Sequence, residues 1–517
     1  MPDNRNLDAA WTYHDGTKHS YQSVRASTHS LDFSNQPLPF KIYTTLEPIP
    51  LPEGFLPLTM PALAAIAAPP SPPKAGQAEQ VPDLMRIAQT LHLAAGITRH
   101  RQLQNWEFQF RAAACTGALY HIELYLVCGE LPGLRAGVYH FGVHDFALRR
   151  LRAGDYRVVL TRATAGEPSI AHAPAVIICT STYWRNAWKY QARAYRHAFW
   201  DTGTILANLL AAAAGQALPA RIILGFVDAA VNGLLDVDSD HEASLALVPL
   251  GRAVASAPGV TPAIEPLRLE TTALSRFEVE YPAICAMHAA SSLASEDEVM
   301  AWRGAGPLGD PPAAADSTIP LPPLGGPDAP TDSVTEVILR RGSTRCFARK
   351  PLVMAQLSTI LDRATRGIAA DFLDPPGRSL ITPYVIVHAV DGLAPGAYVY
   401  HRAARALERL RAGEFRNQAG YLGLEQELPA EAGVNVYCLA DLHAILARFG
   451  NRGYRAAQIE GGITGGKLYL ASYSQHLGAT GLTFYDDDVT AFFSPHAAGK
   501  SVMFLTAIGQ RARRAHS

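Results

Sequence analysis

Two arginines and a serine stand within five residues of one another and carry the clearest chemical signal in this sequence. Arg341, Ser343 and Arg345 lie in the run LRRGSTRCFARKPL. Guanidinium forks bind phosphate oxygens in pairs, and a hydroxyl between them suits a polyol attached to that phosphate. We expect the run to lie just before a helix and to bind such a ligand. A pair of surface charges at a helix start is the alternative, although cations are mildly unfavourable there.

Carboxylates and thiols give no comparable signal. Asp486, Asp487 and Asp488 are adjacent, but their side chains point in different directions and no histidine or cysteine joins them at ligand spacing. We therefore interpret them as a solvated helix start. The six cysteines are Cys115, Cys128, Cys179, Cys285, Cys346 and Cys438. They form no CxxC pair, so we expect neither a disulfide framework nor a zinc site, and we predict no metal.

Periodicity predicts the elements that must position these residues. Apolar residues from Leu84 to Ala94 recur at helical spacing, which predicts a helix. Residues 120–127 alternate and are rich in β-formers, which predicts a strand, and residues 502–508 predict another. The Ala-rich run 205–215 falls short of the roughly 20 residues that span a bilayer, so we expect a buried helix there.

Proline-rich stretches divide the chain. Prolines are so dense in parts of residues 1–75 that we expect an extended arm without regular sheet or helix. The Pro- and Gly-rich stretch 304–332 cannot bury enough apolar surface to fold alone, which predicts an interdomain linker. We therefore predict an arm over 1–75, a domain over 76–255, a connecting segment over 256–333 and a second domain over 334–517.

Composition is that of a globular chain with a small-molecule or protein partner. The 517 residues exceed one ordinary core, because about 150 residues make a domain. With 48% hydrophobic residues, 18% charged residues and a formal net charge of −1, no overall field attracts nucleic acid or an anionic membrane. The N-terminus shows no signal-peptide pattern, so we expect a cytoplasmic protein.

The two predicted domains repeat each other. The segment GLRAGVY at 133–139 corresponds to GLAPGAY at 392–398, and LRAGDYR at 151–157 corresponds to LRAGEFR at 410–416. Both pairs share one offset, since 392 − 133 and 410 − 151 equal 259. The same offset relates Tyr195 to Tyr454, Gly203 to Gly462 and Asp228 to Asp487. This constancy implies two copies of one fold, which we expect to be α+β and to pack as an intramolecular pseudo-dimer.

Four parts of the chain, taken in order, carry a family resemblance. They are the arm YHDGTKHSYQSVR, the segments RAAACTGALYHIELYLV and NAWKYQARAYRHAFWDTG, and the pair RRGSTRCF and GATGLTFYDDDV. Together they resemble the nitroreductase superfamily, in particular its azoline dehydrogenase branch of SagB or thiazole-oxidase type, in tandem-duplicated form. The resemblance implies an α+β nitroreductase-like fold that binds FMN in clefts at a dimer interface, each cleft built by both protomers.

The resemblance also implies which residues contact FMN. Arg341, Ser343 and Arg345 would reach its phosphate, ribityl chain and pyrimidine edge. A Gly-rich turn of Gly478, Ala479 and Gly481 would pass beside the ring, a closing turn with Thr116 and Gly117 would come from the other half, and Lys500 and Arg511 would be further phosphate contacts.

Each half lacks what the other supplies. Residues 77–83 of the first half hold no arginine cluster, and residues 219–222 have lost the glycines of the ring turn. The second half offers Asp374-Pro375-Pro376 where the closing turn would be. We therefore expect one competent FMN site and one decayed site.

Lys189 and Tyr190 match the Lys-Tyr pair that lies over the flavin in azoline dehydrogenases. The offset places Arg448 and Phe449 in the second half, which cannot replace an amine and a phenol in proton transfer. Aromatising an azoline removes a C–H proton while hydride leaves to flavin N5, so a base must lie beside the ring. A solvated lysine beside a packing tyrosine is the alternative.

Three functions are compatible with these residues. The first is an FMN-dependent dehydrogenase that oxidises an azoline or a related C–N or C–C bond in a peptide-like or carrier-bound intermediate. A separate cyclodehydratase would make that ring, and the chain would form a further homodimer or act alone. The second is an NAD(P)H-dependent nitro or quinone reductase. The third is a non-catalytic scaffold in a biosynthetic complex.

Overall fold

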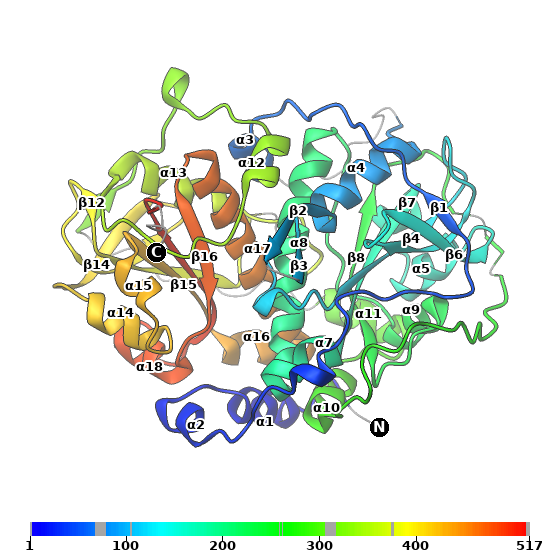
Figure 1. Ribbon diagram of the computed structural model, residues 1–517, viewed down its shortest axis with the longest axis horizontal. Coiled ribbons are helices and arrows are strands. Elements are labelled where there is room, and N and C mark those ends of the chain that lie inside the picture. The colour runs from blue at the N-terminus through cyan, green and yellow to red at the C-terminus, as the bar shows by residue number, and fades with distance from the viewer. Residues whose placement is uncertain are drawn as a thin grey trace.

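Two antiparallel sheets lie side by side, with two long helices between them (Figure 1). The computed structural model describes residues 3–67, 79–103, 106–257, 259, 260, 262–304, 317–373 and 377–512. The first sheet has the order β1-β6-β5-β4-β7-β8, and the second has the order β16-β17-β15-β11-β13-β14-β9.

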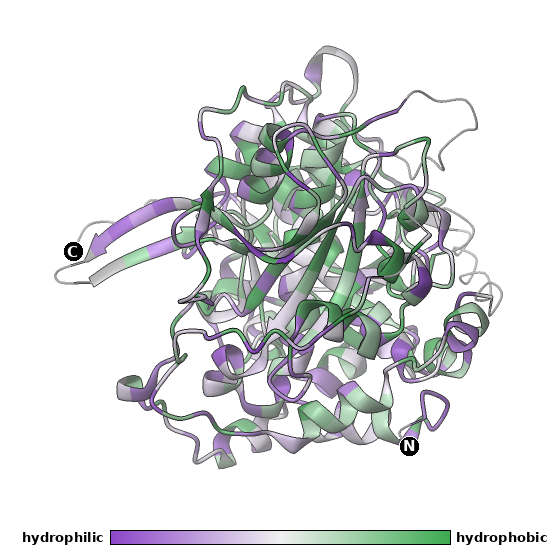
Figure 2. Ribbon diagram, turned by 90° about the vertical axis from the view of Figure 1, so that its right-hand side faces the viewer, coloured by the Kyte–Doolittle hydropathy of each residue, from purple (hydrophilic) through white to green (hydrophobic). Residues whose placement is uncertain are grey.

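The first half contains one sheet, a projecting hairpin and the helices around them. The strands of its sheet are β1 (Pro48–Pro50), β4 (Ile122–Cys128), β5 (Gly137–Gly142), β6 (Ala147–Ala153), β7 (Ala175–Thr182) and β8 (Glu242–Leu250). Its helices are α4 (Leu84–Ala95), α5 (Arg157–Ala163), α6 (Pro168–Ala171), α7 (Tyr183–Tyr190), α8 (Ala194–Gly215) and α9 (Asp228–Leu235). The hairpin of β2 (Ile97–Leu103) and β3 (Trp106–Arg111) projects from the body (Figure 2).

The second half repeats most of these elements in the same order, although among the described residues it has no counterpart of the β2–β3 hairpin. Its main strands are β9 (Thr318–Pro320), β11 (Ile381–Val387), β13 (Gly396–His401), β14 (Ala406–Ala412), β15 (Val434–Ala440), β16 (Gly478–Leu482) and β17 (Ser501–Gly509), and β10 (Leu352–Val353) pairs with β12 (Val390–Asp391). Its helices are α12 (Val334–Arg340), α13 (Met354–Ala364), α14 (Arg416–Leu422), α15 (Glu427–Glu431), α16 (Leu442–Phe449), α17 (Arg452–Ser474) and α18 (Asp486–Phe493).

The two sheets share one plan down to their irregularities. The order β6-β5-β4-β7-β8 is matched by β14-β13-β11-β15-β17. A register shift follows Val138 in one sheet and Ala397 in the other, and a second follows Cys179 and Cys438. Both pairs differ by 259, because 397 − 138 and 438 − 179 give the same number. The offset found in the sequence therefore also relates the positions of β-bulges, which locally twist and bend a strand.

The long helices α8 and α17 pack against each other at glycines. A Cβ on Gly203 would lie 2.6 Å from the backbone of Gly462, and one on Gly462 would lie 2.6 Å from the backbone of Trp200. Any side chain here would push the helices apart. The predicted buried helix at 205–215 is confirmed as the C-terminal part of α8. Within the described part of the chain, no helix is long and apolar enough to cross a membrane.

Buried ion pairs tie each half to the other in a reciprocal way. Arg193 and Arg196, at the start of α8, place Nη1 at 2.9 and 2.6 Å from the carboxylate of Asp486. At the offset positions, Arg452 and Arg455 place Nη1 at 2.6 and 2.7 Å from the carboxylate of Asp228. Each carboxylate lies in the half opposite to its arginines, so removing either one would leave two buried cations uncompensated.

Asp486 corrects part of the prediction made for the acidic run. The run does begin helix α18, but Asp486 is only 3% exposed and is not solvated. Asp487 remains on the surface, where it pairs with Lys18. The offset of 259 related Asp228 to Asp487, but the residue that binds the arginines is Asp486, one position earlier, whose partners lie about 290 residues upstream.

The N-terminal arm is not extended throughout, contrary to the prediction. It contains α1 (Asp8–Gly16), α2 (Tyr21–Ala26) and α3 (Ala62–Ile66), because its prolines are clustered between these helices. The Pro48–Pro50 segment forms the edge strand β1, where a missing N–H is tolerated. Of the Pro-rich stretch that follows, residues 68–78 lie outside the described residues.

The connecting segment also contains regular structure. Helices α10 (Pro282–Ala290) and α11 (Glu296–Arg303) precede the linker. Within the linker, residues 305–316 lie outside the described residues, and β9 adds an edge strand to β14. The linker therefore ends as part of the second sheet.

Candidate functional site

The arginine run follows a helix, whereas the sequence suggested that it would precede one. Arg341 is the residue after α12, and the next helix, α13, begins at Met354. Cations are favourable at a helix C-terminus, so the position alone would be compatible with a structural role. The guanidinium of Arg341, however, forms hydrogen bonds with the first half. Arg341 donates from Nε to the carbonyl of Ala112 at 2.9 Å and from Nη2 to that of Arg111 at 3.2 Å, both in the first half.

The residues after Arg341 lie against the glycine segment, which is a strand and not a turn. β16 is an edge strand paired with β17, and Thr344 donates its backbone N–H to Ala479 at 2.9 Å. Ser343 Oγ lies 3.1 Å from the hydroxyl of Tyr469, which also accepts the N–H of Gly481. A Cβ on Gly478 would collide with Thr344. The phosphate run and the glycine segment thus form one surface.

The guanidinium groups of Arg99, Arg341 and Arg511 lie around this surface, and the charge of a fourth, Arg345, acts on Tyr190. Arg99 Nη1 lies 3.6 Å from the position of a Cβ on Gly342. Burial lowers the pKa of Arg341, and the charge of Arg99 acts in the same direction. Among the described residues, none of the four forms an ion pair with a carboxylate. A cluster of unpaired cations is the donor set that a phosphate ester requires.

The closing turn from the first half lies next to Tyr190. Thr116–Ala118 is a 3₁₀ turn in which Gly117 has φ of +65°, a conformation that favours glycine. A Cβ on Gly117 would lie 2.9 Å from the Tyr190 hydroxyl oxygen. Gly117 therefore permits both the turn and the approach of Tyr190.

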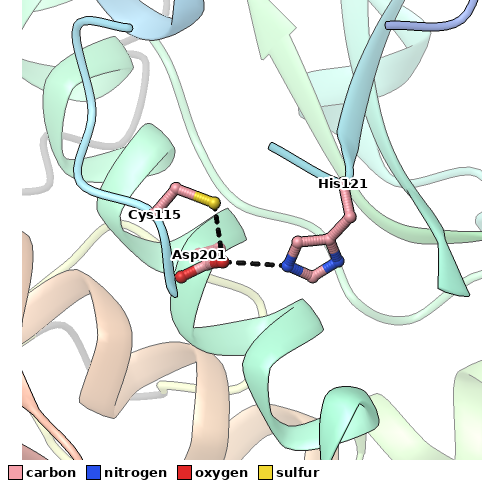
Figure 3. Close-up of side chains that lie close together, drawn as sticks. All are labelled: Cys115, His121 and Asp201. Carbon is pink, nitrogen blue, oxygen red and sulfur yellow. Dashed lines mark hydrogen bonds and ion pairs between the residues drawn. The ribbon is translucent and has the colours of Figure 1, made fainter. Parts of the chain in front are cut away.

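The carboxylate of Asp201 on α8 fixes this turn through hydrogen bonds (Figure 3). Its carboxylate accepts the N–H of Thr116 at 3.0 Å, the hydroxyl of Thr116 at 2.8 Å and the thiol of Cys115 at 3.1 Å. His121 Nε2 lies 2.8 Å from the same carboxylate, and His121 Nδ1 lies 2.9 Å from the hydroxyl of Ser181. A buried chain of hydrogen bonds from β7 to α8 thus fixes the turn.

Cys115, His121 and Asp201 come within metal-ligand reach of one another, but their atoms are already engaged. Burial and the carboxylate of Asp201 raise the pKa of the Cys115 thiol, so that it stays protonated and donates. Both carboxylate oxygens of Asp201 accept hydrogen bonds from the turn. A metal would have to displace these bonds, so we interpret the cluster as a support for the turn.

Tyr190 and Lys189 end helix α7 and are half-buried. Burial raises the pKa of Tyr190, and the charge of Asp201 adds to this, while Arg345 opposes it. Tyr190 is therefore a phenol that can donate a hydrogen bond. Lys189 Nζ lies 5.4 Å from the centre of the Tyr190 ring.

A row of aromatic rings connects Tyr190 to the second half. Ring centres are 4.6 Å apart for Tyr190 and His197, 4.9 Å for His197 and Trp200, and 5.9 Å for Trp200 and Phe504. Phe504 packs against Gly481 of β16. His197 also forms a hydrogen bond, since its Nδ1 lies 2.8 Å from the side-chain oxygen of Asn186.

Lys500 does not join this cluster. It precedes β17, whereas Arg511 follows that strand. At about 3.3 Å per residue, the two lie roughly 35 Å apart along the chain, so they cannot contact one phosphate together. Arg511 is the one near the site, because its Cγ lies 2.7 Å from the position of a Cβ on Gly478.

Trp302 of α11 lies beside Phe449, the offset counterpart of Tyr190. It is 1% exposed, its ring centre lies 5.3 Å from that of Phe449 in a tilted arrangement, and it lies 3.1 Å from the position of a Cβ on Gly225. Ile222 donates its N–H to Ala369 at 2.8 Å. The decay of one site stays a prediction. The second-half closing turn, residues 374–376, lies outside the described residues.

Comparison with known proteins gives a match for the first half. Residues 111–252 match the model of the nitroreductase family. The matched segment contains the closing turn, Asp201 and the Lys189–Tyr190 pair.

Particular relatives agree with that class. A Methanocaldococcus jannaschii protein named a putative nitroreductase is 25% identical over 171 residues, which cover 33% of this chain and 81% of the relative. A crystal structure titled a putative nitroreductase from Anabaena variabilis superposes with a TM-score of 0.76 at 24% identity, covering 98% of this chain and 99% of that one. A crystal structure titled a putative nitroreductase from Ralstonia eutropha is 18% identical and covers 42% of this chain and 100% of that one, with a TM-score of 0.32 that carries no weight for the fold. The Anabaena structure shows that the whole chain has the nitroreductase α+β fold.

The sequence did not indicate several residues that complete the site. Tyr469 and Tyr473 are four residues apart on α17 and both face the arginine run, so their spacing was a usable signal. No sequence signal pointed to Arg99, His121 or Asp201, because their partners lie far away in sequence.

Proposed function

We propose that this protein is an FMN-dependent oxidoreductase with one composite FMN site per chain. The arginine run, β16 and Arg511 would hold the phosphate end, and Thr116, Gly117, Lys189 and Tyr190 would close the site from the first half. The observation that carries this proposal is a group of four arginines that form no ion pair among the described residues, next to a segment that matches the nitroreductase family model. The lack of carboxylates around Arg99, Arg341, Arg345 and Arg511 within the described chain fits a dianionic phosphate.

The chemistry of the residues fits this cofactor at both ends. Guanidiniums and the hydroxyl of Ser343 suit a phosphate and a ribityl chain, and the aromatic rings near β16 suit a flat ring system. FMN bound here would supply a two-electron acceptor. The protein's own contribution would be to exclude water, orient the ring and place proton-handling groups beside it.

We further propose that the reaction is the dehydrogenation of an azoline or a related C–N or C–C bond in a peptide-like or carrier-bound intermediate. Lys189 would take the proton from the carbon to be oxidised. Tyr190, kept protonated by burial, would orient the substrate through its hydroxyl or donate to it. A separate cyclodehydratase would supply the ring, and a further homodimer remains compatible with this role.

Flavin stoichiometry tests the composite site. We expect one FMN per chain, released on denaturation and quantified by absorbance against protein concentration. Two FMN per chain would contradict the decay of the second site. A colourless protein that takes up no FMN would instead support the non-catalytic scaffold.

Lys189→Ala tests the reaction. We expect this variant to retain FMN and to lose azoline oxidation, whereas Lys500→Ala, a lysine outside the cluster, retains both. Full azoline oxidation by Lys189→Ala would contradict the proposed role of the lysine.

An NAD(P)H-dependent nitro or quinone reductase is the second candidate, because the matched family model and the named relatives are nitroreductases. It needs the same FMN site but no base. Nitroarene reduction that is unchanged by Lys189→Ala, in a protein that never oxidises an azoline, would favour this candidate.

A further inference from the structure

A cavity of about 260 Å³ lies in the first half, apart from the residues assigned to the FMN site. It is bounded by the start of α7, by the loop of residues 236–242 and by residues 269–278, which pair with the N-terminal arm through Tyr43 and Thr271. None of the twelve residues assigned to the FMN site lines it. At the lower end of the range for ligand pockets, its volume suits a molecule smaller than a typical drug.

The inner wall presents donors that have no acceptor in the protein. Arg185 is fully buried and uses Nη1 to bind Glu123 and the carbonyl of Tyr120. Its Nε and Nη2 have no hydrogen-bond partner among the described residues, and neither has the hydroxyl of Thr182, which is 6% exposed. Buried donors of this kind are normally satisfied, so these atoms indicate an oxygen acceptor that enters the cavity.

One side wall is electrically neutral. Lys41 Nζ lies 2.7 Å from Oε2 of Glu242, and Oε1 of Glu242 accepts hydrogen bonds from Tyr125 and Thr180. The two charges therefore satisfy each other. They add no net charge for a ligand to meet.

The mouth, in contrast, is acidic. Asp236, Asp238 and Glu278 line it, and His241 lies 4.0 Å from Asp238 and 3.6 Å from Glu278. Apart from the neutral pair of Lys41 and Glu242, the lining has three carboxylates and one guanidinium. That guanidinium, on Arg185, is already bound to Glu123 behind the wall. A ligand that fits must therefore carry a positive charge at the mouth and an oxygen at the inner wall.

We propose that this cavity binds a small primary amine that also bears a carbonyl or carboxylate oxygen, as in a free α-amino acid or an amino-acid amide. The ammonium group would lie among Asp236, Asp238 and Glu278. The oxygen would accept from Arg185 and Thr182. This site is separate from the FMN cluster and does not depend on the proposed reaction.

Calorimetric titration of the purified full-length protein tests the proposal, with glycinamide, L-lysine, L-lysinamide and N-acetylglycinamide as probes. We expect saturable binding of at least one of the three amines and none of N-acetylglycinamide, which lacks the ammonium group. Retained binding of the carboxylate or of the amide then distinguishes the two oxygen sources. No saturable binding of any amine up to about 10 mM would overturn the proposal.

Variants locate the binding. The double variant Asp238→Asn, Glu278→Gln changes exposed side chains and should weaken binding by about tenfold or more. Thr182→Val should weaken it as well. Asp240→Asn, a neighbouring exposed aspartate that does not line the cavity, is the matched control and should bind as the unchanged protein does. Equal affinity in all variants would overturn the proposal, and FMN content measured in each keeps this outcome distinct from failure of the flavin site.

Discussion

Replacing Asp201 by asparagine should both destabilise the protein and release the closing turn. The carboxylate accepts from Thr116 N, Thr116 Oγ1, Cys115 Sγ and His121 Nε2, all within 3.1 Å. Asparagine keeps one acceptor and turns an N–H₂ toward these donors. A hydrogen bond to a charged group contributes about 1.5–3 kcal/mol, and an unsatisfied buried donor costs about 1–3 kcal/mol. We therefore expect a loss of roughly 3–5 kcal/mol in the free energy of unfolding.

Urea denaturation of the purified protein measures this loss. The exposed Asp391→Asn is the matched control and should change stability by less than about 0.5 kcal/mol. Ser181→Ala, at the far end of the chain of hydrogen bonds, should cost only about 1 kcal/mol.

A double-mutant cycle separates support of the turn from a general loss of stability. Thr116→Val removes the hydroxyl that bonds to Asp201, so the two changes should be non-additive by about 1 kcal/mol or more. Strict additivity, or an Asp201→Asn variant as stable as the unchanged protein, would refute the reasoning. Weakened FMN binding in the variant is a further expectation that depends on the proposed site.

Three further predictions concern other parts of the structure. Burial alone would raise the pKa of Asp486, but Arg193 and Arg196 lower it to about 2. The ionised carboxylate therefore stabilises the folded protein by about 2 kcal/mol above pH 4, and this contribution is lost as the pH falls through 2. Asp486→Asn should flatten the acid side of the curve of unfolding free energy against pH. Arg341→Ala should weaken FMN binding by tenfold or more in fluorescence titrations, whereas Lys500→Ala should leave it unchanged, and equal effects would contradict the placement of the site. Gly462→Ala should lower the melting temperature by several degrees in calorimetry, since its Cβ would meet the backbone of Trp200; an unchanged value would show that the helices α8 and α17 can separate at little cost.

Much of the fold was predictable because it rests on local patterns and on a repeat. The helix at Leu84 and the strand near Tyr120 follow from periodicity, and both are confirmed with their ends displaced by a residue or two. The offset of 259 also relates the β-bulges, because a bulge belongs to the strand that contains it. The arm was harder, since α1 is held by contacts with distant residues. His14, for example, lies 3.4 Å from the hydroxyl of Tyr454.

The candidate site was predictable only as a set of segments. The sequence indicated the arginine run, the glycine segment and the closing turn, and the structure brings these together. The sequence could not predict the structural surroundings of these segments. Whether Arg341 precedes or follows a helix depends on where α12 is capped, and the capping box of Ser333 and Glu336 was not recognised. Asp201 was missed because an isolated aspartate within a helical pattern carries no sign of the turn that it supports.

The crossed ion pairs have a consequence for how the chain is made. Arg193 and Arg196 are synthesised about 290 residues before Asp486, the carboxylate that neutralises them. At about 5–20 residues per second, the ribosome needs roughly 15–60 s to cover that distance. During this interval the first half has its sheet but lacks the anion that allows the start of α8 to be buried. We expect that face to stay open, and to be exposed to chaperones and to other nascent chains, until the last tenth of the protein emerges.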